Sequence, residues 1–476
     1  MLVPFRPGNW SEGHLRVPWT PGAPTLGALV VGGGPAGAGL LLAARSAGLL
    51  DALLALPIRI IERGGAVGAG ELGGFAITSD SHAESFFRAV EAAGEPPLSL
   101  ALETPAGREV LGRRGAPVAL STAAAFLAGA CEELRGALAA SGRDPFLTGF
   151  EALSARRMAR GGWRVRCRFV AGGGEIELEA ASLVLATGAV EAPERLWREA
   201  VAGGPPLLPR FAGKVVRSSV LLSPAGAVAA AERLSACASP KVAVVGGSHS
   251  AVACARLLLD ASPGLRFAEG GVTVLHRRPL RLTYASEAAA LADGYAEFGP
   301  EDVCARTGRV FPLAGFRSDA RDLLRRAWRL GGSGPEPRLR LHRLGREPDA
   351  EAERILAEAD LVVAALGYQP RALPLFDADG GRVALRAETA AGAPLVDARS
   401  RVFAADGVPV DGVFGIGLAA GYPLRGTHGE ASFEGQANGL SLWHGEVGAA
   451  IVRDLLSTRP ERAAARVPDL ASAEHA

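Results

Sequence analysis

Two glycine-rich turns constrain the fold of this 476-residue chain more than any other feature. The first lies in Leu29–Gly39 and the second in Val242–Ala253. Each follows a short run of apolar residues and precedes an apolar segment of helical length, as in the strand–turn–helix unit that binds a dinucleotide. The sequence therefore predicts an α/β fold with two Rossmann-like dinucleotide-binding domains.

The first turn has the spacing G-x-G-x-x-G, formed by Gly32, Gly34 and Gly37. The first glycine permits the tight turn, the second lets the backbone approach a pyrophosphate, and the third lets the helix pack closely. Glu62 follows the next predicted strand, Ile58–Ile61. Its carboxylate can accept hydrogen bonds from ribose hydroxyls and repels a 2′-phosphate, so this turn is predicted to bind FAD or NAD rather than NADP.

Two later segments favour FAD at the first turn. Leu183–Gly188 is a predicted strand that ends on Thr187 and Gly188, and Val413–Gly417 is a late strand followed by Leu418. Late turns of this kind approach the flavin in proteins that bind two dinucleotides.

The second turn reads G-x-S-x-x-A, with Ser248 in place of the middle glycine of Gly246–Ala251. The Ser248 hydroxyl can donate to a phosphate, and Ser250 can either bind a phosphate or cap the helix. Arg277 and Arg278 follow the next predicted strand, where the first unit has an acid. A guanidinium can hold a 2′-phosphate by a bidentate pair, which favours NADPH; the alternative is a solvated strand end.

Charge and composition argue against several other functions. The chain has 51 basic and 50 acidic residues, so its net charge of +1 favours neither nucleic acid nor an anionic membrane. No apolar run reaches the roughly 18 residues of a spanning helix, and the N-terminus lacks a signal sequence, so a cytoplasmic location is expected. The five cysteines include no closely spaced pair, unlike disulfide reductases of similar architecture, and the eight histidines show no metal-ligand spacing, so no metal site is predicted.

The order of the segments predicts that the second unit is inserted in the first. Helices are predicted over 35–50 and 434–456, strands over 175–179 and 182–186, and a connector rich in Pro and Gly over 189–240. We expect an N-terminal arm at 1–26 and a flexible tail at 458–476. The FAD-binding domain is predicted at 27–200 and 371–457, and the NADPH-binding domain with its connector at 201–370.

Three motifs together resemble the class B flavoprotein monooxygenases, with their N-hydroxylating branch nearest. The first is the pair of turns, including Gly246–Ala251, which is similar to the G-G-x-Q-S-A turn of amine N-hydroxylases. The second is Phe211–Arg217, which resembles F-x-G-x-x-x-H with Arg217 in place of His. The third is Val363–Pro370, which is similar to the A-T-G-Y segment with Leu366 in place of Thr.

The resemblance implies an enzyme in which NADPH reduces FAD and O₂ adds to the flavin as a C4a-(hydro)peroxide. A small-molecule nucleophile, most often an amine nitrogen, then takes up one oxygen. Two alternatives are a flavin oxidoreductase that passes electrons to an organic acceptor without oxygenation, and a non-catalytic nucleotide sensor. The substrate and the oligomeric state are open, a homo-oligomer included.

Catalytic candidates are His249, Asp80 and Ser81, because the resemblance places the last two near the flavin ring. His249 can equally pack at the start of its helix, and Asp80 can equally cap a helix at Ala83–Ala93. His428 and Glu430 are further candidates to face the substrate. The predicted cofactor-binding residues are Gly32, Gly34, Pro35, Ala36, Gly37, Glu62, Arg63, Thr187, Gly188, Arg217, Gly246, Ser248, His249, Ser250, Arg277, Arg278, Gly367, Tyr368, Gly417 and Leu418.

Overall fold

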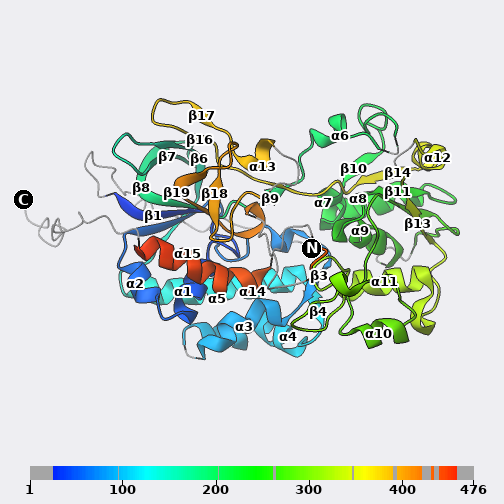
Figure 1. The fold of residues 1–476 in the computed structure, drawn as a ribbon, viewed down its shortest axis with the longest axis horizontal. Coiled ribbons are helices and arrows are strands. Elements are labelled where there is room, and N and C mark those ends of the chain that lie inside the picture. The colour runs from blue at the N-terminus through cyan, green and yellow to red at the C-terminus, as the bar shows by residue number, and fades with distance from the viewer. Residues whose placement is uncertain are drawn as a thin grey trace, which may run out of the picture.

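Two β-sheets organise the protein, one at each end of the molecule (Figure 1). The computed structural model describes residues 25–94, 96–201, 203–260, 264–345, 348–389, 394–420, 430–433 and 439–457. The predicted arm, except residues 25 and 26, and the predicted tail lie outside these ranges, as does His428.

The larger sheet has the order β17-β16-β6-β7-β8-β1-β2-β5, with β19 beside β8 and β18 beside β19. Strands β19, β8, β1, β2 and β5 are parallel, so their carboxyl ends meet at one edge. That edge is where open α/β sheets bind ligands. The strands are β1 (Leu26–Val31), β2 (Ile58–Glu62), β5 (Phe146–Thr148), β6 (Phe150–Arg157), β7 (Trp163–Phe169), β8 (Glu175–Leu185), β16 (Leu375–Phe376), β17 (Arg382–Val383), β18 (Arg401–Phe403) and β19 (Pro409–Gly415).

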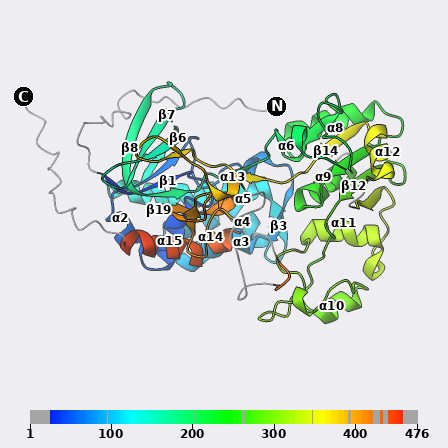
Figure 2. The same cartoon turned by 45° about the horizontal axis from the view of Figure 1, so that its top comes forward.

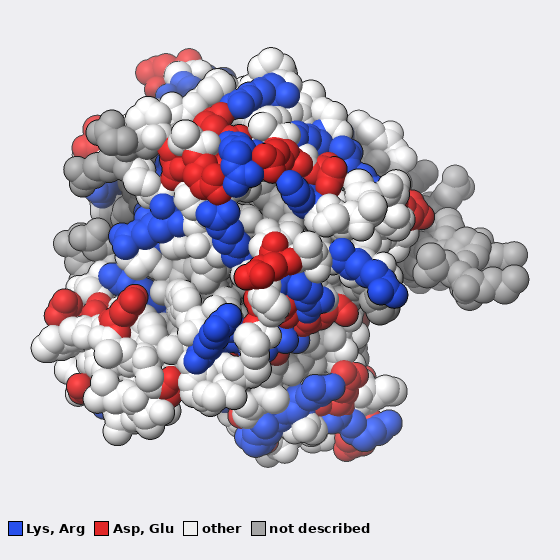
Figure 3. Space-filling view, turned by 90° about the vertical axis from the view of Figure 1, so that its right-hand side faces the viewer, with Lys and Arg blue, Asp and Glu red and all other residues white. Residues whose placement is uncertain are grey.

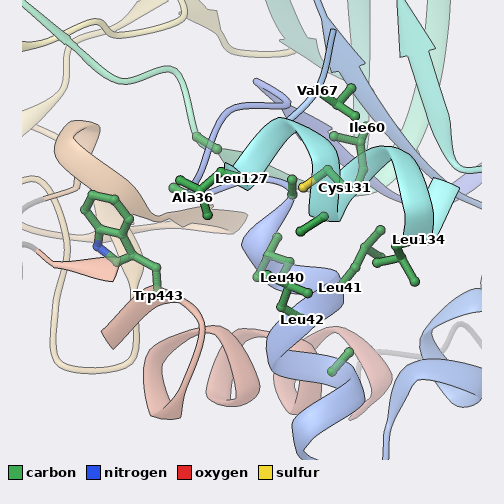
Figure 4. Packing of buried hydrophobic residues seen from close by; sticks show 14 of the residues in the cluster. Ala36, Leu40, Leu41, Leu42, Ile60, Val67, Leu127, Cys131, Leu134 and Trp443 are labelled. Carbon is green, nitrogen blue, oxygen red and sulfur yellow. The ribbon is translucent and has the colours of Figure 1, made fainter. Parts of the chain in front are cut away.

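Helices pack on one another beneath this sheet (Figure 1). Leu40, Leu41 and Leu42 of α1 are buried beside Leu127 and Cys131 of α5 (Figure 4). The close fit requires a small residue, because a Cβ on Gly448 of α15 would lie 2.6 Å from the Cβ of Ala43. The helices of this part are α1 (Gly39–Ser46), α2 (Leu50–Leu54), α3 (Glu84–Ala93), α4 (Pro105–Gly112), α5 (Leu120–Ala140), α13 (Arg386–Thr389), α14 (Leu440–Trp443) and α15 (Glu446–Ser457).

The smaller sheet is entirely parallel, with the order β10-β14-β11-β12-β13. Its central strands are buried along their whole length, which explains their continuous apolar sequences. Its strands are β10 (Val215–Arg217), β11 (Val242–Val245), β12 (Val272–His276), β13 (Leu339–Arg343) and β14 (Leu361–Ala364). The helices of this part are α6 (Arg195–Arg198), α7 (Ser218–Leu221), α8 (Pro224–Ser235), α9 (His249–Asp260), α10 (Glu287–Ala292), α11 (Ser318–Trp328) and α12 (Ala350–Glu358).

The chain leaves the larger sheet after β8 and returns to it at β16, so the smaller sheet is an insertion (Figure 2). On the way out it forms β9 (Ala189–Val190), and on the way back β15 (Gln369–Pro370), and these two strands pair with each other. A further pair, β3 (Thr78–His82) and β4 (Pro117–Ala119), lies at the border between the two parts. The predicted fold class, with one dinucleotide-binding unit inserted in the other, is confirmed.

Several predicted elements have different limits in the structure. The helix predicted over 35–50 is divided into α1 and α2, because Gly48 has a φ of +67° between them. The last helix, predicted to run from 434 to 456, is divided into α14 and α15 at His444, and residues 434–438 lie outside the described ranges. The two strands predicted over 175–186 are the single strand β8.

The connector predicted over 189–240 contains α6, α7 and α8, none of which was predicted from its Pro- and Gly-rich sequence. Ser223 caps α8 by accepting a hydrogen bond from the Gly226 N–H at 3.1 Å, and Pro224 occupies the first helical position. No helix in the described ranges is both long and apolar enough to cross a bilayer.

Candidate active site

The first glycine turn is shaped by contacts that exclude any side chain. Gly32 has a φ of +109°, and a Cβ there would lie 2.3 Å from the Ala186 carbonyl oxygen. A Cβ on Gly37 would lie 1.8 Å from the carbonyl oxygen of Gly32. The late turn closes on the same place, since a Cβ on Gly417 would lie 2.6 Å from the Cβ of Ala36. The predicted turn and the two predicted later segments are therefore neighbours at one edge of the larger sheet.

Glu62 is held at the end of β2 by two backbone donors. Its carboxylate accepts hydrogen bonds from the Gly33 N–H at 2.9 Å and the Gly64 N–H at 2.8 Å. This fixes the carboxylate beside the turn, where a ribose would lie. Arg63 points elsewhere and forms an exposed ion pair with Glu71.

His444 also supports the first glycine turn, although no sequence pattern predicted this role. Its Nε2 lies 2.9 Å from the Pro35 carbonyl oxygen, to which the protonated nitrogen donates. Burial lowers the pKa of His444, so the ring is neutral. A lone histidine in an apolar helix cannot be assigned a partner 409 positions away in the chain from its spacing alone.

A buried hydroxyl at the same edge has no hydrogen-bond partner among the described residues. It is Thr187 Oγ1, next to Gly188, which has a φ of +73°. The first glycine turn fits the pyrophosphate of a dinucleotide, and the fixed Glu62 carboxylate fits its ribose. The Thr187 hydroxyl offers a further hydrogen bond to such a ligand. Leu418 is exposed directly after the late turn.

The second glycine turn repeats this geometry on the smaller sheet. Gly246 has a φ of +138°, and a Cβ there would lie 2.2 Å from the Ala365 carbonyl oxygen. Helix α9 begins at His249, so Ser248 stands before the helix and is exposed. Ser250 lies inside the first helical turn, which excludes the alternative that it is the N-cap.

The two arginines after β12 differ in their contacts. Both are exposed, but Arg277 donates from Nη2 to the Ala200 carbonyl oxygen at 2.5 Å, whereas the Arg278 guanidinium has no such contact with a described residue. The Arg278 carbonyl oxygen lies 2.8 Å from Nδ1 of His276, whose pKa is lowered by burial. Arg278 is therefore the more available guanidinium for a 2′-phosphate.

Arg217, Gly367 and Tyr368 meet where the chain crosses between the two parts. Arg217 donates from Nη1 to the Glu191 carbonyl oxygen at 3.0 Å. The buried Glu191 carboxylate accepts hydrogen bonds from the Ser218 hydroxyl and from the Ser219 N–H, the latter at 2.8 Å. The Gly367 carbonyl oxygen accepts a hydrogen bond from Arg195 at 3.3 Å, and burial with the Glu191 charge raises the pKa of Tyr368. Their roles in cofactor binding stay predictions.

The catalytic candidates from the two parts come together. His249 Nε2 lies 3.9 Å from Asp80 Oδ2, and the His249 ring packs on Phe316 with ring centroids 4.7 Å apart. Burial lowers the pKa of His249, the Asp80 carboxylate raises it, and Arg317 lowers it further. His249 Nε2 is buried and has no hydrogen-bond partner among the described residues.

Asp80 does not cap α3, which removes its alternative role. The N-cap of α3 is Ala83, without a side-chain hydrogen bond, and Asp80 lies within β3 with its carboxylate exposed. The Ser81 hydroxyl lies 3.4 Å from Asp80 Oδ1.

Glu430 has a structural contact instead of facing open space. It is buried, and its two carboxylate oxygens accept hydrogen bonds from the N–H groups of Leu313 at 3.0 Å and Ala314 at 2.9 Å. Burial raises the pKa of this carboxyl. The residue therefore fastens a segment of the larger part to the smaller part.

Comparisons with known proteins agree with this geometry. No family model matches the chain. The CMP-5'-(3-aminopropyl)phosphonate hydroxylase of Streptomyces rubellomurinus is 31% identical over 441 residues, which are 90% of this chain and 97% of the relative.

Solved structures share the fold at low identity. The FAD-bound cadaverine monooxygenase of Erwinia amylovora has a TM-score of 0.54 at 14% identity, over 91% of this chain and 94% of the other. The ornithine N-hydroxylase of Kutzneria sp. 744, with reduced FAD, NADP⁺ and L-ornithine, has a TM-score of 0.52 at 19% identity, over 91% and 99%.

The hydroxylase at 31% identity favours an oxygenase over an oxidoreductase without oxygenation. Both solved structures contain FAD, and the ornithine N-hydroxylase also contains NADP⁺, which are the cofactors predicted for this chain. The chain belongs to the same family as the CMP-5'-(3-aminopropyl)phosphonate hydroxylase, and its fold is that of the N-hydroxylating branch of the class B flavoprotein monooxygenases.

Proposed function

We propose that this monooxygenase transfers one oxygen atom of O₂ to the nitrogen of a primary amine in a small metabolite that also carries a phosphonate. The observation that carries the substrate class is the relative at 31% identity, whose substrate is CMP-5'-(3-aminopropyl)phosphonate. The match covers 97% of that relative and 90% of this chain, so it spans both parts of this chain.

The glycine turns would hold the two cofactors. Gly32, Gly34 and Gly37 would contact the FAD pyrophosphate, and Glu62 would accept hydrogen bonds from its ribose. Gly246 and Ser248 would contact the NADPH pyrophosphate, with Arg278 at the 2′-phosphate. When bound, FAD supplies the hydride-accepting and oxygen-transferring chemistry.

His249 would prepare the amine. An ammonium group has no lone pair with which to attack oxygen, so it must first lose a proton. Neutral His249 can accept that proton at Nε2, and Asp80 Oδ2, 3.9 Å away, stabilises the resulting imidazolium. The lowered pKa of His249 means that the ring is neutral before the transfer.

Reconstitution with FAD tests the proposal. The purified protein, supplied with NADPH, O₂ and 3-aminopropylphosphonate or its CMP ester, is expected to consume NADPH and O₂ and to form a hydroxylamine, measured by mass spectrometry. A protein that cannot be reconstituted with FAD, or that oxidises NADPH but hydroxylates neither amine, contradicts the proposal.

A further inference from the structure

Three buried polar atoms without partners lie at the border between the two parts. They are Nε2 of His249, Nε of Arg317 and the hydroxyl oxygen of Ser318, and none has a hydrogen bond to a described residue. Most buried polar groups in proteins are hydrogen-bonded, so three such atoms in one region indicate a site built for a polar ligand.

Side-chain contacts bring these atoms to one place. Phe316, against which the His249 ring packs, directly precedes Arg317 and Ser318. Ser318 has a φ of +48°, a left-handed conformation that is strained in a residue other than glycine and is concentrated at functional sites. We call the region between His249, Asp80, Arg317 and Ser318 the seam.

The other side of the seam belongs to β3. Asp319 Oδ2 accepts a hydrogen bond from the Thr78 hydroxyl at 2.5 Å, and Asp80 lies two residues beyond Thr78. The seam is therefore lined by residues from both parts, with a carboxylate on β3 and a guanidinium on the loop before α11.

Arg317 differs from the arginines around it because it has no ion-pair partner in the part of the chain that the structure describes. Arg256, Arg325 and Arg326 each lie within 4.0 Å of a carboxylate oxygen. Among the described residues, no carboxylate oxygen lies that close to the Arg317 guanidinium. The seam thus offers an uncompensated positive charge and, across from it, the exposed carboxylate of Asp80.

We propose that Arg317 and Ser318 bind the phosphonate of the amine substrate, while its amine lies toward Asp80 and His249. The proposal rests on the proposed function and adds the residues that select the anionic substrate. A guanidinium can donate two parallel hydrogen bonds to a phosphonate, and the Ser318 hydroxyl can donate a third. The cofactor phosphates have their own candidate groups at the glycine turns and after β12.

Two amines of equal chain length test this selection. 3-Aminopropylphosphonate carries the anion, and 3-amino-1-propanol has a neutral hydroxyl in its place. For the wild-type enzyme we expect the KM for the phosphonate to be about 100-fold lower than that for the alcohol. In Arg317→Gln the ratio is expected to collapse toward one, in Arg317→Lys to be intermediate, and in Ser318→Ala to fall by about 3- to 10-fold. Arg354→Gln, which removes an exposed paired arginine on α12, is the matched control and should keep the wild-type ratio.

The outcomes separate this proposal from the proposed function. An unchanged KM ratio in all three seam variants overturns the phosphonate site, and a rise in the NADPH KM alone assigns the guanidinium to the dinucleotide; in both cases amine hydroxylation stands. If the wild-type flavin is reduced by NADPH but neither amine is hydroxylated, the proposed function itself fails. If Arg317→Gln does not retain FAD, the ratios in Arg317→Lys and Ser318→Ala decide.

Discussion

At the scale of single residues, burial determines the protonation state of two histidines near the candidate site. His249 and His444 both have a pKa lowered by burial, yet they do different work. His444 Nε2 bonds the Pro35 carbonyl oxygen and so has a structural role, whereas His249 Nε2 has no partner in the described residues. An unpartnered, neutral imidazole is the form that can accept a proton.

The pH dependence of hydroxylation tests the role of His249. Its ordinary pKa is about 6.5, and burial lowers it, so the base is lost only at a pH below about 6.5. We expect hydroxylamine formation at saturating NADPH and O₂ to fall below that pH. In His249→Gln the rate should be lower and this acidic limb absent; a variant that keeps both the rate and the limb contradicts the role.

Cofactor preference tests the arginines after β12. Replacing Arg277 and Arg278 with Gln should raise the NADPH KM by about 10- to 100-fold and leave the NADH KM within about 3-fold, because NADH has no 2′-phosphate. Arg278→Gln alone should give most of the effect, since Arg277 already donates to Ala200. Equal changes in both KM values would remove the 2′-phosphate argument.

At the scale of the elements, the FAD site depends on segments that are distant in sequence. The late turn after β19 touches the first turn through Gly417 and Ala36, and α14 reaches it through His444. The site is thus formed by elements that precede the inserted unit in the chain and by elements that follow it.

A pair of glycine variants tests this closure. Gly417 and Gly407 have φ values of +81° and +84°, so Ala is strained to a similar degree at either position. A Cβ at 417 would lie 2.6 Å from the Cβ of Ala36, whereas a Cβ at 407 has no atom within 4 Å. Gly417→Ala should weaken FAD binding at least about 10-fold relative to Gly407→Ala, measured by flavin fluorescence titration. Equal FAD affinities would show that the contact is not needed.

The sequence predicted those features that local geometry dictates. Gly32, Gly37 and Gly246 could be identified because a tight strand–helix turn requires glycine whatever surrounds it. Arg317 and His444 could not, because their neighbours are set by how the two parts pack. The division of α14 from α15 at His444 and the following glycine was missed, because a single glycine within a largely apolar segment does not by itself end a helix.

At the scale of the whole molecule, the two parts are joined by apolar as well as polar contacts, since Phe75 and Ile77 of the larger part pack against the core of the smaller part. Figure 3 shows basic and acidic side chains intermixed on the face at the end of the smaller sheet. Between the two parts, the Glu430 carboxylate accepts hydrogen bonds from the N–H groups of Leu313 and Ala314 and so holds residues 430–433 against that loop. This contact lies a few residues from Arg317, so it also positions the seam.

Removing the hydrogen bonds of Glu430 should lower the stability of the contact between the two parts. Glu430→Ala leaves two N–H groups without their acceptor and is expected to cost about 2 kcal/mol of stability, seen as a lower thermal midpoint. Glu430→Gln, which keeps one acceptor oxygen, should cost less. Glu109→Ala, an exposed position on α4, is the control, with an expected change within about 0.5 kcal/mol. A midpoint for Glu430→Ala equal to that of the control would contradict the fastening.

The pairing of β9 with β15 has a mechanical consequence. Both crossings of the chain run through one short ladder, in which Gln369 is opposite Val190 and Pro370 is opposite Ala189. Gly188 and Gly367, with φ values of +73° and +96°, stand beside this ladder on the two crossings. Because the two crossings are hydrogen-bonded to each other, a rotation of one part against the other would have to bend both of them together.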